Sequence, residues 1–149
     1  MQRAIIFLTI IFLTNFVGMY YGFYDHWWFD ISLHFLGGFF MAMLMVRYLA
    51  DLLSDAPRPS DNANTRALRS YGSVKLKNYL IIIGAVSFIG VVWEFAEYLA
   101  NQTLVEPLYN NFGIKAYFIG DLDDTINDLL MDILGALTFA LSWRNKLLK

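Results

Sequence analysis

Acidic side chains recur at helical spacing in the segment from Gly120 to Asp132, which otherwise has the composition of a membrane-spanning helix. At about 3.6 residues per turn, several of its aspartates fall within a narrow arc of one helix face. These are Asp121, Asp124, Asp128 and Asp132. Carboxylates inside a bilayer are costly and normally face a bundle interior or a wet cavity, so this face predicts a functional site. Cation binding and proton transfer are the chemistry that such a face supports.

Two other segments also carry polar side chains on one face. Asp30 and His34 are spaced i, i+4, and Glu94 and Glu97 are spaced i, i+3, so each pair lies on one side of its helix. Short connections make neighbouring helices antiparallel. In that arrangement the three polar faces lie toward the same end of the bundle and converge on one pocket.

The predicted pocket collects negative charge, and no Lys or Arg lies in the same half of these segments. The repulsion must be relieved, either because some carboxyls keep their protons or because a bound cation neutralises them. The cation is the favoured interpretation, since His34 adds a good ligand to carboxylates that repeat on three helices. The predicted metal ligands are Asp30, His34, Glu94, Glu97, Asp124, Asp128 and Asp132.

This ligand set is rich in oxygen and contains one imidazole. It favours Mg²⁺, Mn²⁺ or Ca²⁺ as the cofactor, and Zn²⁺ or Fe²⁺ is also compatible with it. In a catalytic site the ion would polarise a substrate or activate water, and His34 or Glu94 is the predicted proton carrier. A structural hydrogen bond is an equal alternative for His34. For Asp121 a simpler explanation is available, because aspartate caps the start of a helix well.

The composition is that of a membrane protein. The chain has 149 residues, of which 58% are hydrophobic, a mean hydropathy of +0.47, a net charge of −2 and no cysteine. Without cysteine there are no disulfides and no thiolate metal sites, and the near-neutral charge argues against nucleic-acid binding. Four apolar segments, at about 4–23, 31–49, 78–99 and 126–143, each approach the length of about 20 residues that a bilayer requires. They predict a single-domain, all-α integral membrane protein, a four-transmembrane-helix bundle.

The first apolar segment is expected to be a retained helix rather than a signal peptide, because no small-residue cleavage site follows it. Basic residues then define the topology. If the N-terminus, the loop at 51–77 and the C-terminal tail share one side, that side holds ten of the eleven Lys and Arg residues, and the other holds only Lys115. The positive-inside rule makes the basic side cytoplasmic. Both termini are therefore predicted to be cytoplasmic, and the acidic pocket to face outward.

The two long connections differ in character. The loop at 51–77 is polar and is predicted to be a solvated connector. The outer segment at 101–120 is too apolar for a free loop, so it is predicted to lie on the bilayer surface or to fold over the bundle as a lid. Pro107 and Gly113 are expected to interrupt regular structure there. Glycines within the apolar segments would permit close helix approach, namely Gly37, Gly38, Gly84, Gly90 and Gly135.

Several of these motifs resemble a known family when they are taken in order. They are Asp30-x-x-x-His34, Trp93-Glu94-x-x-Glu97, Gly120-Asp121-x-x-Asp124-Thr125-x-x-Asp128 and Gly135-Ala136. The pattern resembles the VanZ-like membrane proteins, some of which are associated with glycopeptide resistance, and within them the YjdF-like bacterial inner-membrane proteins. The resemblance implies a compact helical protein of the bacterial inner (cytoplasmic) membrane, and it supplies no catalytic residues. The chain is short at its N-terminal end for a YjdF-like protein.

Three functions are compatible with the predicted pocket. The first is a divalent-metal site that binds or processes a membrane lipid or a lipid-linked envelope substrate. The second is a cation- or proton-coupled transporter, against which stands the lack of ionisable residues in the cytoplasmic halves of the helices. The third is a non-catalytic assembly module whose helices are held together by the metal. A homo-oligomer is compatible with each of them.

Overall fold

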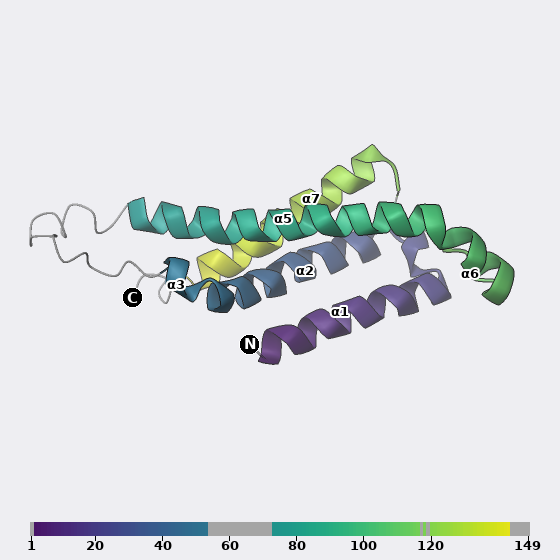
Figure 1. Cartoon of the computed structure of the whole chain (residues 1–149), viewed down its shortest axis with the longest axis horizontal. Coiled ribbons are helices and arrows are strands. Elements are labelled where there is room, and N and C mark those ends of the chain that lie inside the picture. Colours follow the sequence, from purple (N-terminus) through teal and green to yellow (C-terminus); the bar gives the residue numbers. More distant parts are fainter. Residues whose placement is uncertain (1, 54–72, 117, 119, 144–149) are drawn as a thin grey trace, which may run out of the picture.

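The fold is a bundle of four long helices (Figure 1). It is a computed structural model that describes residues 2–53, 73–116, 118 and 120–143, without the side chains of residues 51 and 73–75. The long helices are α1 (Gln2–Tyr21), α2 (Trp27–Tyr48), α5 (Ser73–Thr103) and α7 (Leu122–Ser142). Each is long and apolar enough to cross a membrane, and helices satisfy their own backbone hydrogen bonds where water is absent. The predicted all-α four-helix membrane bundle is confirmed.

The helices are longer at several ends than the hydrophobic segments suggest. The second helix begins at Trp27, four residues before the predicted segment at 31–49, because His26 is extended and ends the preceding turn. The last helix begins at Leu122 rather than near residue 126, because the Asp121 carboxylate accepts the Asp124 N–H at 3.0 Å and caps the helix. This confirms the capping role predicted for Asp121. It also places the acidic face inside a helix.

Short elements connect the spans. A 3₁₀ turn, η1 (Phe23–Asp25), joins α1 to α2, and α3 (Ala50–Leu53) follows α2 at the other end of the bundle. The helix α6 (Val105–Phe112) follows α5, and its side chains are exposed or half-buried. Pro107 does not interrupt this helix as expected, because it lies in the first turn, where no intrahelical N–H bond is lost. Gly113 does end it, with a φ of 68° that suits glycine.

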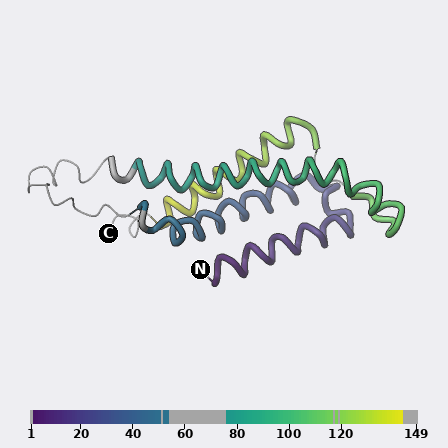
Figure 2. Tube along the Cα trace, in the orientation of Figure 1, coloured from purple at the N-terminus to yellow at the C-terminus, as the bar shows by residue number. Residues whose placement is uncertain are grey.

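The pair α2 and α7 forms the closest contact in the bundle, and the chain traces run side by side in Figure 2. Glycine makes this approach possible. A Cβ on Gly135 would collide with the Phe35 carbonyl oxygen, and a Cβ on Gly38 would lie 2.7 Å from the Asp132 Cα. Small residues at such positions are the usual means of close helix contact in membranes. Gly84 is different from the other predicted contact glycines, because nothing lies within 4 Å of its would-be Cβ.

A compact apolar core fills the half of the bundle near α3. It consists of Ala42 from α2, Ile82 and Val86 from α5, and Ala136 and Phe139 from α7. The ring of Phe39 packs edge-on against Phe139 at 5.3 Å. The helix α1 lies at the edge of the bundle, packed mainly on α2 (Figure 1). This core fixes the positions of three helices just beyond the acidic residues.

Some predictions concern residues outside the described part of the chain. They are the solvated connector over residues 54–72 and the charges of the C-terminal tail from Arg144 onward.

Candidate metal centre

Three helices bring their polar faces together around His34. The imidazole lies seven residues below the first residue of α2, Glu94 lies nine residues before the end of α5, and Asp132 lies ten residues into α7. At about 1.5 Å per residue these side chains sit about 10–15 Å below the helix ends, within the thickness of the hydrocarbon layer. His34, Glu94 and Asp128 are 6%, 7% and 3% exposed. The structure therefore assembles the pocket that the sequence predicts, in the half of the bundle nearer to α6.

The Nε2 atom of His34 faces carboxylates from all three helices. It lies 3.8 Å from Asp30 Oδ1, 3.9 Å from Glu94 Oε1 and 3.9 Å from Asp128 Oδ2. Ligand atoms of Asp30, His34 and Asp128 lie within 4.8 Å of one another, and so do those of His34, Glu97 and Glu94. These are two overlapping ligand sets that share one imidazole.

Several oxygens of this cluster are buried without a hydrogen-bond partner. They are Asp30 Oδ1, Glu94 Oε1 and Asp128 Oδ1. Buried carboxylate oxygens are nearly always hydrogen-bonded or paired, since the loss of their hydration is costly. The halves of α2, α5 and α7 that carry the cluster contain no Lys or Arg. Something other than a basic side chain of these helices must satisfy the carboxylates.

Asp132 lies on the opposite side of the imidazole from the other acids. Its Oδ2 is 3.5 Å from His34 Nδ1. A carboxylate in this position accepts the Nδ1–H proton and directs Nε2 toward a ligand, as in many metal sites that use histidine. Asp132 also fills the space next to Gly90 of α5, where a Cβ would collide with its carboxylate. It is thus placed to orient His34, whereas the sequence counted it among the metal ligands.

The remaining predicted residues lie nearer to the edge of the pocket. Glu97 is half-buried one turn beyond Glu94, and the Trp93 side chain is its hydrogen-bond partner. Asp124 is half-buried beside Gly120, at the start of α7. Thr125 is a hydrogen-bond partner of Glu94. Neither Asp124 nor Asp132 belongs to the two ligand sets centred on His34 Nε2.

Tyr24 is a member of the site that sequence analysis assigned to an aromatic belt at the membrane surface. It lies in η1, outside the spans, and its side chain is half-buried next to Asn15 of α1. Burial raises the pKa of its hydroxyl, and the charges of Asp30 and Glu97 raise that pKa further. The hydroxyl therefore keeps its proton and serves as a donor at the entrance to the acidic pocket. Only the return of the chain at Gly22, with a φ of 74°, brings Tyr24 there.

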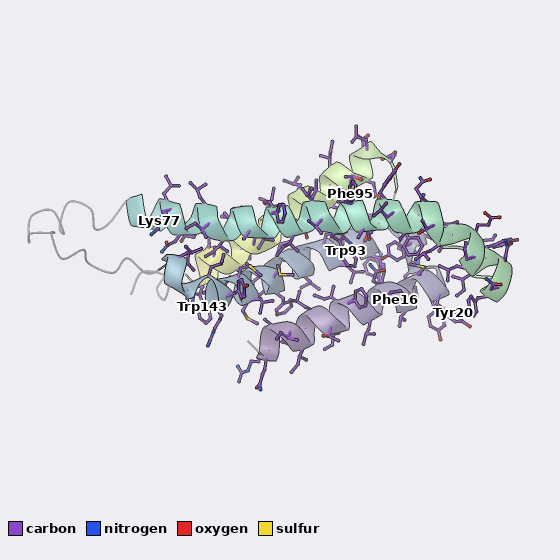
Figure 3. The ribbon with its side chains drawn as sticks, viewed as in Figure 1. Phe16, Tyr20, Lys77, Trp93, Phe95 and Trp143 are labelled. Carbon is purple, nitrogen blue, oxygen red and sulfur yellow. The ribbon has the colours of Figure 1, made fainter. Side chains whose placement is uncertain are left out.

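A cavity of about 210 Å³ adjoins the cluster between α1, α2 and α5. His34 and Asp132 line its polar end, and Leu8, Ile11, Met41 and Ile89 are among the apolar side chains that line the rest. Trp93 also lines it. In Figure 3 Trp93 lies on the side of α5 that faces α1, whereas Phe95 lies on the opposite side. The segment at 101–120, predicted to cover the pocket, contributes none of the described lining residues.

Fold and site together define a small polytopic membrane protein with a histidine and carboxylates buried between its spans. Over residues 2–147 the chain matches the family described as "Predicted membrane protein (DUF2238)", and it belongs to that family. It is also similar to an uncharacterized protein of Thermotoga maritima, with 30% identity over 131 residues, covering 87% of this chain and 55% of the relative. The chain thus spans about half the length of that relative. No solved structure matches it.

Proposed function

We propose that this chain is a bacterial inner-membrane protein, related to the VanZ-like and YjdF-like proteins, that binds a divalent cation around His34. The site presents the cation to a membrane lipid or a lipid-linked envelope substrate. One observation carries the proposal: buried carboxylate oxygens without partners, contributed by three different helices, surround a single imidazole nitrogen. A bound divalent ion would satisfy those oxygens and cancel their repulsion.

The distances suit an ion of this kind. Two ligands of one ion can be no farther apart than twice the bond length, about 4.2 Å for Mg²⁺ and about 5 Å for Ca²⁺. The separations of 3.8, 3.9 and 3.9 Å between His34 Nε2 and the facing carboxylates fall below both limits. Carboxylate oxygens with one imidazole favour Mg²⁺, Mn²⁺ or Ca²⁺, and Zn²⁺ or Fe²⁺ is also compatible.

The arrangement also supports chemistry at the ion. Ligands from Asp30 and Asp128 would leave positions open toward the cavity, where a substrate oxygen can bind. Glu94 lies close enough to His34 to exchange a proton with a group bound at the ion, and His34 itself is the other candidate for that role. A lipid is the natural substrate, because the site lies below the membrane surface and the cavity beside it is apolar.

Transport through the site is the less favoured function. The core of Ala42, Ile82, Val86, Ala136 and Phe139 lies between the pocket and the α3 end, and its side chains are apolar. A proton or cation would have to cross this layer without a polar group among these residues. The orientation that we propose, with both termini in the cytoplasm, follows from the positions of the basic residues.

Metal content and metal titration test the proposal directly. Protein purified in detergent without chelator would be subjected to elemental analysis, then stripped with chelator and titrated with Mn²⁺ while free Mn²⁺ is followed by electron paramagnetic resonance. One tightly bound ion per chain is the expected result. Asp128→Asn should abolish it, and Asp123→Asn, an exposed aspartate on the same helix, should retain it. Folded wild-type protein that binds no divalent ion refutes the proposal.

A further inference from the structure

The cavity beside the metal centre has a defined polarity along the membrane normal. Its polar end is formed by His34 and Asp132, and its wall continues along α2 to Met41. From His34 to Met41 is two turns of helix, or about 10 Å, directed away from α6 and toward the middle of the bilayer. Over that length the side chains that line it are almost all apolar. The cavity is therefore polar near one membrane surface and apolar toward the midplane.

A lipid in the leaflet at the α6 end has the same order of groups. Its ester and phosphate groups lie near the surface, and its acyl chains extend toward the midplane. Such a molecule can bury chain methylenes in the apolar part while its polar part reaches the carboxylates. A water-soluble ligand entering from the surface would leave the apolar part unfilled, and that part accounts for most of the cavity wall.

The helices also leave a route from the bilayer. The helix α1 packs mainly on α2, and the rings of Phe12 and Trp93, 6.1 Å apart, lie between α1 and α5. Both rings line the cavity, and Phe12 is 46% exposed on the lipid-facing side of the bundle. Rotation of these two side chains would open the cavity sideways without any change in helix packing.

We propose that this cavity binds one acyl chain of a phospholipid from the leaflet at the α6 end and so places the lipid's polar part at the metal centre. The volume suits one chain. A dry apolar cavity of about 150 Å³ holds benzene, with six carbons, so a cavity of about 210 Å³ holds about eight carbons of a chain at the same density. The inference deepens the proposed function and rests on it for the role of the metal, whereas chain binding itself requires no ion.

Fluorescence quenching measures chain binding at this place. The chain has four tryptophans, so replacing Trp27, Trp28 and Trp143 by Phe leaves Trp93 as a reporter inside the cavity. This variant would be titrated in detergent with a phosphatidylcholine whose acyl chains carry bromine, a quencher of tryptophan. The zwitterionic head makes the signal report the chain rather than the charge. Saturable quenching with one lipid per protein is the expected result.

Two double variants with the same change in composition locate the chain. Leu8→Phe with Ile11→Phe places bulk in the cavity from α1, and Ile10→Phe with Leu13→Phe places it on the lipid-facing side of the same helix. The first pair should weaken binding about tenfold or more, the loss expected when about two methylene groups are no longer buried. The second pair should leave binding unchanged. Ile89→Phe, which fills the cavity from α5, should repeat the first result even if α1 tolerates substitution poorly.

Three outcomes overturn the inference. Quenching may rise in proportion to lipid content without saturation, the cavity and control pairs may give equal affinities, or a polyprenyl phosphate may displace the bromolipid with a more than tenfold advantage. The metal proposal is tested separately, because Asp128→Asn in the Trp93 reporter should still bind the bromolipid. Loss of lipid binding with intact Mn²⁺ binding would remove only the acyl-chain site, and the opposite pattern would remove only the metal.

Discussion

The contact between α2 and α7 makes one substitution particularly informative. In Gly38→Ala, the new Cβ would lie 2.7 Å from the Asp132 Cα, against ordinary contact distances of 3.4–4 Å. The obstacle is backbone, which cannot rotate away as a side chain can. The helices must therefore separate locally by about 0.7 Å, the difference between 3.4 and 2.7 Å. Overpacking of this kind costs about 1–3 kcal/mol of unfolding free energy.

The same displacement should alter the metal centre. His34 lies one turn before Gly38, and Asp128 lies one turn before Asp132, so the gap between His34 and Asp128 widens with the helices. Adding about 0.7 Å to the present 3.9 Å gives about 4.6 Å. This exceeds the limit of about 4.2 Å for two ligands of Mg²⁺ and stays below that of about 5 Å for Ca²⁺. Gly38→Ala should therefore weaken the binding of Mg²⁺ far more than that of Ca²⁺.

Thermal melting in detergent and isothermal titration with each ion measure the two effects. Each kcal/mol lost should lower the melting temperature by about 2–4 °C in a chain of this size. Gly84→Ala is the matched control, since nothing lies within 4 Å of its would-be Cβ, and it should be as stable as wild type or more so. A Gly38→Ala variant that melts with wild type and binds both ions with wild-type affinity would refute the packing on which the metal centre depends.

Further outcomes follow from individual residues. Asp121→Ala should lower stability by about 1 kcal/mol through loss of the helix cap, measured by melting, and leave Mn²⁺ affinity unchanged. Mn²⁺ affinity should fall as the pH is lowered, because the carboxylates and His34 must be deprotonated to bind the ion, and titrations at several pH values would show any pH-independent affinity that contradicts this. Tyr24→Phe should leave the phenolate absorbance reached at about pH 11 unchanged, because burial and the nearby acids already raise the pKa of Tyr24 above its usual value, and a measurable decrease would contradict that environment. His34→Ala should abolish Mn²⁺ binding in protein that is still folded, whereas a purely structural role for His34 predicts a lower melting temperature with Mn²⁺ binding retained.

The sequence predicted the membrane class and the residues of the site for clear physical reasons. Apolar segments of bilayer length must become helices, since no other open structure satisfies its backbone in lipid. Acids at helical spacing inside such segments must turn inward, and His34 with Glu94 and Asp128 does so. Asp121 was recognised as a cap because capping is a local property of the chain. In each case the cause lies within one helix.

Relations between helices could not be obtained in this way. The sequence gave no means of distinguishing Asp132 from Asp128, which share one helix face, yet they lie on opposite sides of the His34 ring because Gly38 and Gly90 admit Asp132 closely. Gly84 looked like the other contact glycines and touches nothing. Tyr24 and the cavity lined by Ile11 and Trp93 depend on how α1 is placed against α2 and α5. Hydrophobicity in a bilayer determines that helices form and which faces avoid lipid, whereas the depth and direction of each contact depend on the fit of side chains from separate helices, which exists only in the folded bundle.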